Sequence, residues 1–80
     1  MSDLEKIIAQ TEGYHIKCIM KNGRTYYGTN TGYLAPGDFG DVQKEAFMMF
    51  KRDDGCCWIL HESDIEEITM ESCNILKNKT

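Results

Sequence analysis

The residue types that most often carry catalysis are sparse in this 80-residue chain, and their spacing forms no recognisable catalytic site. His15 and His61 have no Ser or Cys beside them in a nucleophile context, and a nucleophile needs an adjacent base for activation. Asp38 and Asp41 share one segment, but the further oxygen ligands of a calcium loop are missing. The sequence therefore predicts a binding protein with no catalytic residues, no metal and no cofactor.

The cysteines also argue against a metal site, because no C-x-x-C or His-rich spacing joins Cys18, Cys56, Cys57 and Cys73. Cys56 and Cys57 lie in an apolar run, which predicts small buried thiols. The first residues lack the basic and then apolar pattern of a secretory signal. No apolar run approaches the roughly 20 residues that cross a membrane. We therefore expect a cytoplasmic protein with free thiols and no membrane segment.

Two groups of side chains could bind a protein partner. The first is Phe39, flanked by Asp38 and Asp41 in a Gly-rich segment, because loops on a rigid scaffold often carry binding residues. The second is an acidic stretch that contains no base: Glu62, Asp64, Glu66 and Glu67. The net charge of −4 fits a partner with a basic surface. Alternatively, the same acids form a solvated sheet edge whose like charges deter pairing with another sheet.

Other residues allow two further hypotheses. An RNA site could combine stacking rings with bases that neutralise phosphates, using Tyr33, Phe39, Lys17, Lys21 and Arg24. The excess of 13 acidic over 9 basic residues weakens this alternative. A small-ligand pocket could instead be lined by Trp58, Tyr27 and Met48.

The first elements that position these residues are a helix and a hairpin. A capping box from Ser2 to Glu5 and apolar residues at helical spacing predict a helix over 3–12. Alternation from 14 to 20 predicts a half-buried strand, and Asn22-Gly23 predicts a type I′ turn into a second strand over 24–34. Gly28 and Gly32 interrupt that second strand and indicate a bulge or a sharp bend.

The remaining elements are shorter. Residues 35–45 predict a loop, and the apolar run that follows predicts a buried third strand over 46–51. A turn leads to a fourth strand over 56–60, and a tight turn over 61–64 leads to a short last strand. A polar tail over 72–80 ends the chain. The sequence thus predicts one mainly β domain over 1–80, in which a helix precedes a five-stranded antiparallel barrel over 14–70.

These elements carry a resemblance to the Sm-like family, which includes the LSm and Hfq proteins and the Rof-type inhibitors of the termination factor Rho. Ile16–Gly28 looks like the first two strands of that family, with an Asx-Gly turn between them. Trp58–Leu60 followed by Asp64–Ile68 is similar to the closing strands, and the leading helix also matches. The resemblance spans residues 3–70. It implies an Sm-like small barrel, although SH3-like barrels share the same turn and closing pattern.

The resemblance implies either an RNA-binding ring or a regulator of another protein. RNA-binding rings of the family carry an Asp-x-apolar-x-Asn stretch after the second strand and an Arg-Gly pair between the last strands. Here Tyr33–Pro36 replaces the first motif, and no Arg-Gly pair follows Leu60. These departures favour a regulatory module that binds a protein partner, one that itself acts on nucleic acid. Self-association remains open, since a core this small is only marginally stable alone.

Overall fold

The computed structural model describes residues 2–70, so the predicted polar tail and Cys73 lie outside the described residues. The chain forms, in order, α1 (Asp3–Gln10), β1 (His15–Met20), β2 (Thr25–Leu34), β3 (Phe47–Arg52), β4 (Cys57–His61), a 3₁₀ turn η1 (Glu62–Asp64) and β5 (Ile65–Met70). The strands form one antiparallel sheet in the order β4-β3-β2-β1-β5. The mainly β prediction, with a helix before five antiparallel strands, is confirmed. No helix within residues 2–70 has the length and apolar character to span a membrane.

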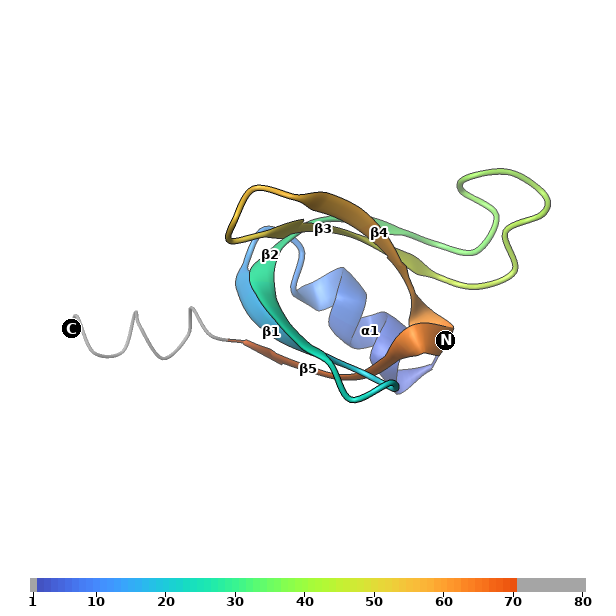
Figure 1. Cartoon of the computed structure of the whole chain (residues 1–80). Helices are drawn as coiled ribbons and strands as arrows, with labels where there is room; N and C mark the ends of the chain where they lie inside the picture. Colours follow the sequence, from blue (N-terminus) through green and yellow to red (C-terminus); the bar gives the residue numbers. More distant parts are fainter. Residues whose placement is uncertain (1, 71–80) are drawn as a thin grey trace.

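The sheet is strongly curved, and β2 is the strand that bends it. Residues 25–29 of β2 pair with β1 and residues 28–34 pair with β3, so the two ladders overlap only at Gly28 and Thr29. The register on β3 shifts between Asn30 and Gly32, so Thr31 is the extra residue of a bulge, and bulges increase local twist. The strands therefore wrap into the curved wall seen in Figure 1. The three residues of η1 join β4 to β5, which are the two edges of the sheet.

Helix α1 packs against β2 and β5 and is fixed by its first residues. The Ser2 hydroxyl accepts from the backbone N–H of Glu5 at 3.0 Å, as an N-cap should. The carboxylate of Glu5 does not complete the predicted capping box but turns inward, where the Tyr33 hydroxyl donates to it at 2.6 Å. Ile8 is fully buried in the core, with Leu4 and Ile7 packed against that core.

Alternate residues of each strand fill the core inside the wall. The predicted alternation of β1 is confirmed, because Ile16, Cys18 and Met20 are buried. In β5 the buried residues Ile65 and Ile68 lie three apart, which a regular strand would place on opposite faces. A bulge resolves this conflict, since Met20 pairs with Ile65 and Ile19 pairs with Glu67. Glu66 is the extra residue of this bulge, and the side chains of Glu66 and Glu67 are both exposed.

Three sequence predictions are wrong in detail. The turn at Asn22-Gly23 is not type I′, because only Gly23 has positive φ; Asn22 instead accepts from the backbone N–H of Arg24 through its side chain. The third strand is buried on one face only, and Met49 on its outer face is 41% exposed. Cys56 and Cys57 are exposed, because they follow the 53–55 turn at the free edge of the sheet.

Candidate functional site

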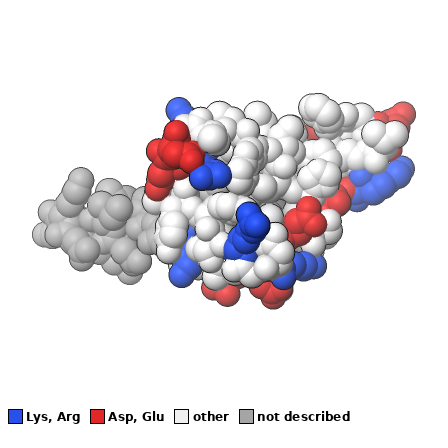
Figure 2. Space-filling model, in the orientation of Figure 1, with Lys and Arg blue, Asp and Glu red and all other residues white. Residues whose placement is uncertain are grey.

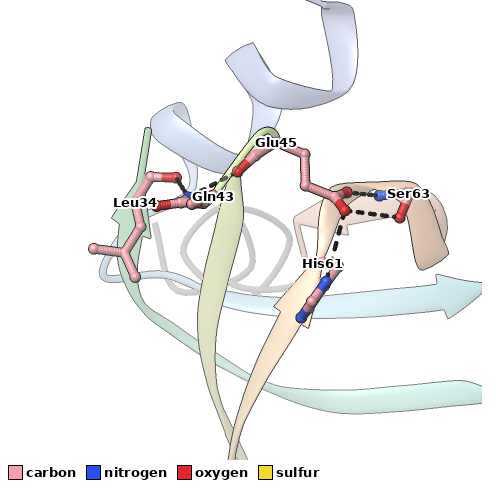
Figure 3. Close-up of polar contacts among 5 residues, drawn as sticks. All are labelled: Leu34, Gln43, Glu45, His61 and Ser63. Carbon is pink, nitrogen blue, oxygen red and sulfur yellow. Dashed lines mark hydrogen bonds and ion pairs between the residues drawn. The ribbon is translucent and has the colours of Figure 1, made fainter. Parts of the chain in front are cut away.

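The loop between β2 and β3 is held in one conformation by a buried side chain. Gln43 donates to the carbonyl oxygens of Glu45 (2.7 Å) and Leu34 (3.4 Å), as Figure 3 shows. Its side-chain oxygen accepts from the backbone N–H of Phe39 at 2.7 Å. Its backbone carbonyl accepts from Gly37, which has a φ of 90° that favours glycine. The loop is therefore an ordered platform built around Gln43.

This platform exposes apolar side chains at its tip. Phe39 is 65% exposed and Val42 is 88% exposed. The Phe39 ring lies 6.4 Å from the ring of Phe47 at the start of β3, and Phe47 lies 4.4 Å from the ring of His61 at the end of β4. Phe39, Phe47 and His61 form the aromatic ridge, which runs from the loop across the outer face of the sheet.

Glu45 fastens the base of the loop to η1. Its carboxylate accepts from the backbone N–H of Ser63 at 2.7 Å and from the Ser63 hydroxyl at 3.2 Å (Figure 3). Nδ1 of His61 lies 3.6 Å from the same carboxylate. The backbone N–H of Ser63 is the main reason that the pKa of Glu45 is lowered. Here the carboxylate lies between the serine and the histidine, so this trio lacks the serine–histidine contact that activates a nucleophile.

Three carboxylates are close in the chain to residues of the aromatic ridge: Asp38 and Asp41 on either side of Phe39, and Glu62 directly after His61. The pKa of Tyr33 is raised to about 12, first by its hydrogen bond to Glu5 and further by burial and by the negative charges of Glu5, Asp38 and Glu62. Asp38 and Glu62 therefore both lie within electrostatic range of the Tyr33 hydroxyl. Glu62 also accepts from the Ser2 hydroxyl. We call the following set the loop surface: Phe39, Val42, Phe47, His61, Asp38, Asp41 and Glu62.

The predicted acidic stretch divides into two parts. Glu62 and Asp64 belong to η1, where the backbone carbonyl of Asp64 accepts from the N–H of Lys21 at 2.9 Å. Glu66 and Glu67 lie on β5, with Glu67 opposite Ile19. Within residues 2–70 none of these four acids makes an ion pair with Lys or Arg. Of the four, Glu62 belongs to the loop surface, since it directly follows His61.

The residues of the RNA hypothesis are spread over several elements. Tyr33 packs against the core, and its hydroxyl donates a hydrogen bond to the Glu5 carboxylate. Lys17 lies on β1 opposite Tyr27, whereas Lys21 and Arg24 flank the β1–β2 turn. Figure 2 shows basic and acidic side chains mixed on the visible face, with no continuous basic groove.

The three residues of the small-ligand hypothesis do not line one pocket. Met48 is fully buried in the core, and Tyr27 is exposed on β2. Trp58 is half-buried, with its ring at 90° to that of Tyr26 and the Arg52 guanidinium 4.8 Å from its centre. This cluster stabilises the end of the sheet opposite the loop.

The sequence predicts four residues of this surface, Phe39, Asp38, Asp41 and Glu62, but not Val42, Phe47 and His61. It also does not predict the role of Gln43, which is buried beneath the surface. An apolar residue in a Gly/Asp loop was a usable signal for Val42. Gln43 gave no local signal, because its partners come from both ends of the loop. Phe47 and His61 meet only through the β3–β4 register.

No group of three or more His, Cys, Asp or Glu side chains is placed to hold a metal ion among residues 2–70. Comparisons with protein-family models, with curated proteins and with solved structures find no match for this chain.

Proposed function

We propose that this chain is a non-enzymatic binding module whose loop surface captures a basic, partly apolar segment of a protein partner. The observation that carries the proposal is an ordered loop that exposes Phe39 and Val42 to solvent. Removing a large apolar side chain from water is favourable in free energy, and exposed aromatic residues are frequent anchors at interfaces. Because Gln43 fixes the loop in advance, binding loses little conformational entropy.

The negative charge near the aromatic ridge favours a partner with basic residues. Asp38, Asp41 and Glu62 supply carboxylates at its border, and a Lys or Arg of the partner would meet them beside Phe39. Charges at the rim of an interface mainly accelerate encounter and exclude wrong partners. The proposed partner segment therefore carries apolar side chains between basic ones.

The Sm-like or SH3-like barrel is the finer part of this proposal. A leading helix, five antiparallel strands and a one-turn connection between the two sheet edges support it. Within that family the loop surface favours a regulator of another protein over an RNA ring. Tyr33 is half-buried against the core with its hydroxyl bonded to Glu5, and the charged residues nearest to Phe39 in the chain are Asp38 and Asp41.

Fluorescence polarisation with labelled synthetic peptides tests the proposal. Three short peptides differ only in composition: alternating Lys and Leu, alternating Glu and Leu, and alternating Lys and Ser. We expect only the Lys/Leu peptide to bind. Phe39→Ser should weaken that binding roughly tenfold or more, as truncation of an interface anchor does.

The matched control is Tyr27→Ser, which removes another aromatic side chain that is 48% exposed but lies on β2 away from the loop. Its peptide affinity should equal that of the unmodified chain. Equal affinity of the Phe39→Ser variant would refute the loop surface as the binding site. Salt-sensitive binding of a labelled single-stranded RNA, with no peptide binding, would support the RNA alternative instead.

A further inference from the structure

One edge of the sheet lacks the features that normally prevent edge-to-edge association. Among residues 2–70, β4 pairs with β3 alone, so its other side presents backbone N–H and C=O groups that no described strand pairs with. Its five residues include no Lys, Arg, Asp, Glu or Pro: Cys57, Trp58, Ile59, Leu60 and His61. The whole segment 55–61 is free of acidic residues, although the chain has a net charge of −4.

The opposite edge is protected. In the part of the chain that the structure describes, β5 pairs with β1 alone, and it carries Glu66 and Glu67, both exposed, at its bulge. Pairing of two β5 strands would bring these carboxylates together, which is unfavourable for like charges. The bulge itself distorts the strand and makes a regular ladder harder to extend. The two edges therefore differ in their capacity to accept another strand.

The surface beside β4 is apolar. On the outer face Met49 and Ile59 pair across β3 and β4, and they are 41% and 46% exposed. A hollow of about 180 Å³ lies there, lined by Thr31, Met49, Phe50, Cys57, Trp58 and Ile59. Figure 2 shows a largely uncharged surface over β3 and β4. An added strand would find apolar contacts as well as backbone partners.

We propose that the β4 edge pairs with β4 of a second copy of this chain, antiparallel and about a twofold axis at Ile59. In this register Ile59 faces Ile59 of the second copy, and Trp58 faces Leu60. Trp58, Ile59 and Leu60 then meet apolar residues, Cys57 faces His61, and within β4 no Asp, Glu, Lys or Arg faces another. The contact is its own complement, so it closes as a dimer and extends the five strands to one continuous sheet.

The choice of a second copy follows from this charge pattern. Two negatively charged chains repel least where they meet through segments without acids, and segment 55–61 is such a segment. A domain of this size is also stabilised by burying apolar surface against a partner, because its own core is small. The dimer uses β4, whereas the tip of the loop surface remains free for a different partner.

The first experiment measures molecular mass by sedimentation over a concentration series. We expect the mass of the unmodified chain to double with rising concentration and Ile59→Lys to remain monomeric. Thr69→Lys, which places the same charge on β5, is the matched control and should dimerise normally. Circular dichroism checks folding, and Ile59 is exposed enough to accept lysine without disturbing the core.

The second experiment tests the register. Cys56, Cys57 and Cys73 are replaced by Ser, and either Ile59→Cys or Glu66→Cys is added to this background. Residues directly opposite in an antiparallel pair are close enough for a disulfide. With an added thiol oxidant, Ile59→Cys should give a covalent dimer and Glu66→Cys should not. Buried Cys18, with a thiol pKa raised to about 11 by burial, should remain unreactive.

Three outcomes would overturn the proposal. One is a monomeric mass at every concentration tested, with no Ile59→Cys dimer. Another is a larger closed ring, which requires β4 to meet a different edge. The last is equal cross-linking of the Ile59→Cys and Glu66→Cys chains, which would indicate random collision.

Discussion

Asn30 shows how one polar residue can organise the interior of a small domain. It is fully buried, and its amide nitrogen donates to the carbonyl of Ile8 (2.8 Å) and to the hydroxyl of Thr11 (3.0 Å). Its side-chain oxygen accepts from the backbone N–H of Gly32 at 3.0 Å. The same side chain therefore forms hydrogen bonds with polar groups at the end of α1 and at the bulge of β2. No periodicity in the sequence identifies it, because its partners lie on two separate elements.

Asn30→Leu should destabilise the protein by about 3 kcal/mol, because several buried polar groups lose their partner at once. Urea unfolding followed by circular dichroism measures this change. Asn22→Ala is the matched control, since Asn22 makes one exposed hydrogen bond in the β1–β2 turn. It should cost less than about 1 kcal/mol. Similar losses for the two variants would contradict the role given to Asn30.

At the scale of elements, the long strand β2 depends on two glycines for different reasons. A Cβ on Gly28 would lie 2.3 Å from the backbone oxygen of Lys51, so the two strands approach one another only without a side chain there. A Cβ on Gly32 would meet the Met49 sulfur at 3.2 Å, and that side chain is flexible and exposed. The sequence indicated a distortion in this strand but could not distinguish close approach from the bulge.

Gly28→Ala should therefore destabilise the protein by about 2 kcal/mol or more, because the backbone of β3 must shift. Gly32→Ala should change stability by less than about 1 kcal/mol, since Met49 can move and alanine restricts the unfolded chain. Thermal unfolding of the two variants side by side measures the difference. Equal melting temperatures would show that the close approach of Gly28 to the Lys51 backbone does not require glycine at position 28.

Most elements could be predicted from the sequence, because their signals are local. Alternation gives β1, the Ser2 cap gives the start of α1, and Gly55 marks the turn before β4. What local signals could not give are contacts between distant segments. The burial of Glu5 beneath Tyr33 and the aromatic ridge both depend on how the sheet curves. For the candidate site, Phe39 was predictable, whereas its neighbours were set by strand register.

At the scale of the whole molecule, acid should weaken the corner that joins the loop to η1. The pKa of Glu45 is lower in the folded protein than its ordinary value of 4.5, chiefly because Ser63 donates to its carboxylate. The ionised group therefore stabilises the folded state. This contribution is complete above the ordinary pKa and is lost as pH falls through the lowered value. Asp54 has a lowered pKa for a similar reason, since the N–H of Cys56 donates to it.

Glu45→Gln should reduce the free energy of unfolding at neutral pH by about 1 kcal/mol and flatten its decline in acid. Urea unfolding at neutral pH and near pH 3 measures both effects. Asp41→Asn, which removes an exposed loop carboxylate, should keep the slope of the unmodified chain. The prediction fails if Glu45→Gln and the unmodified chain lose stability in parallel.

The loop around Gln43 has a consequence for how such a protein can evolve. Its conformation comes from one buried amide and from backbone hydrogen bonds, whereas Phe39 and Val42 point to solvent. Folding and recognition thus depend on different residues of the same segment. Mutations at the tip can change the preferred partner without first being compensated in the core. Paralogues with the same scaffold could diverge in specificity through substitutions at these outward positions alone.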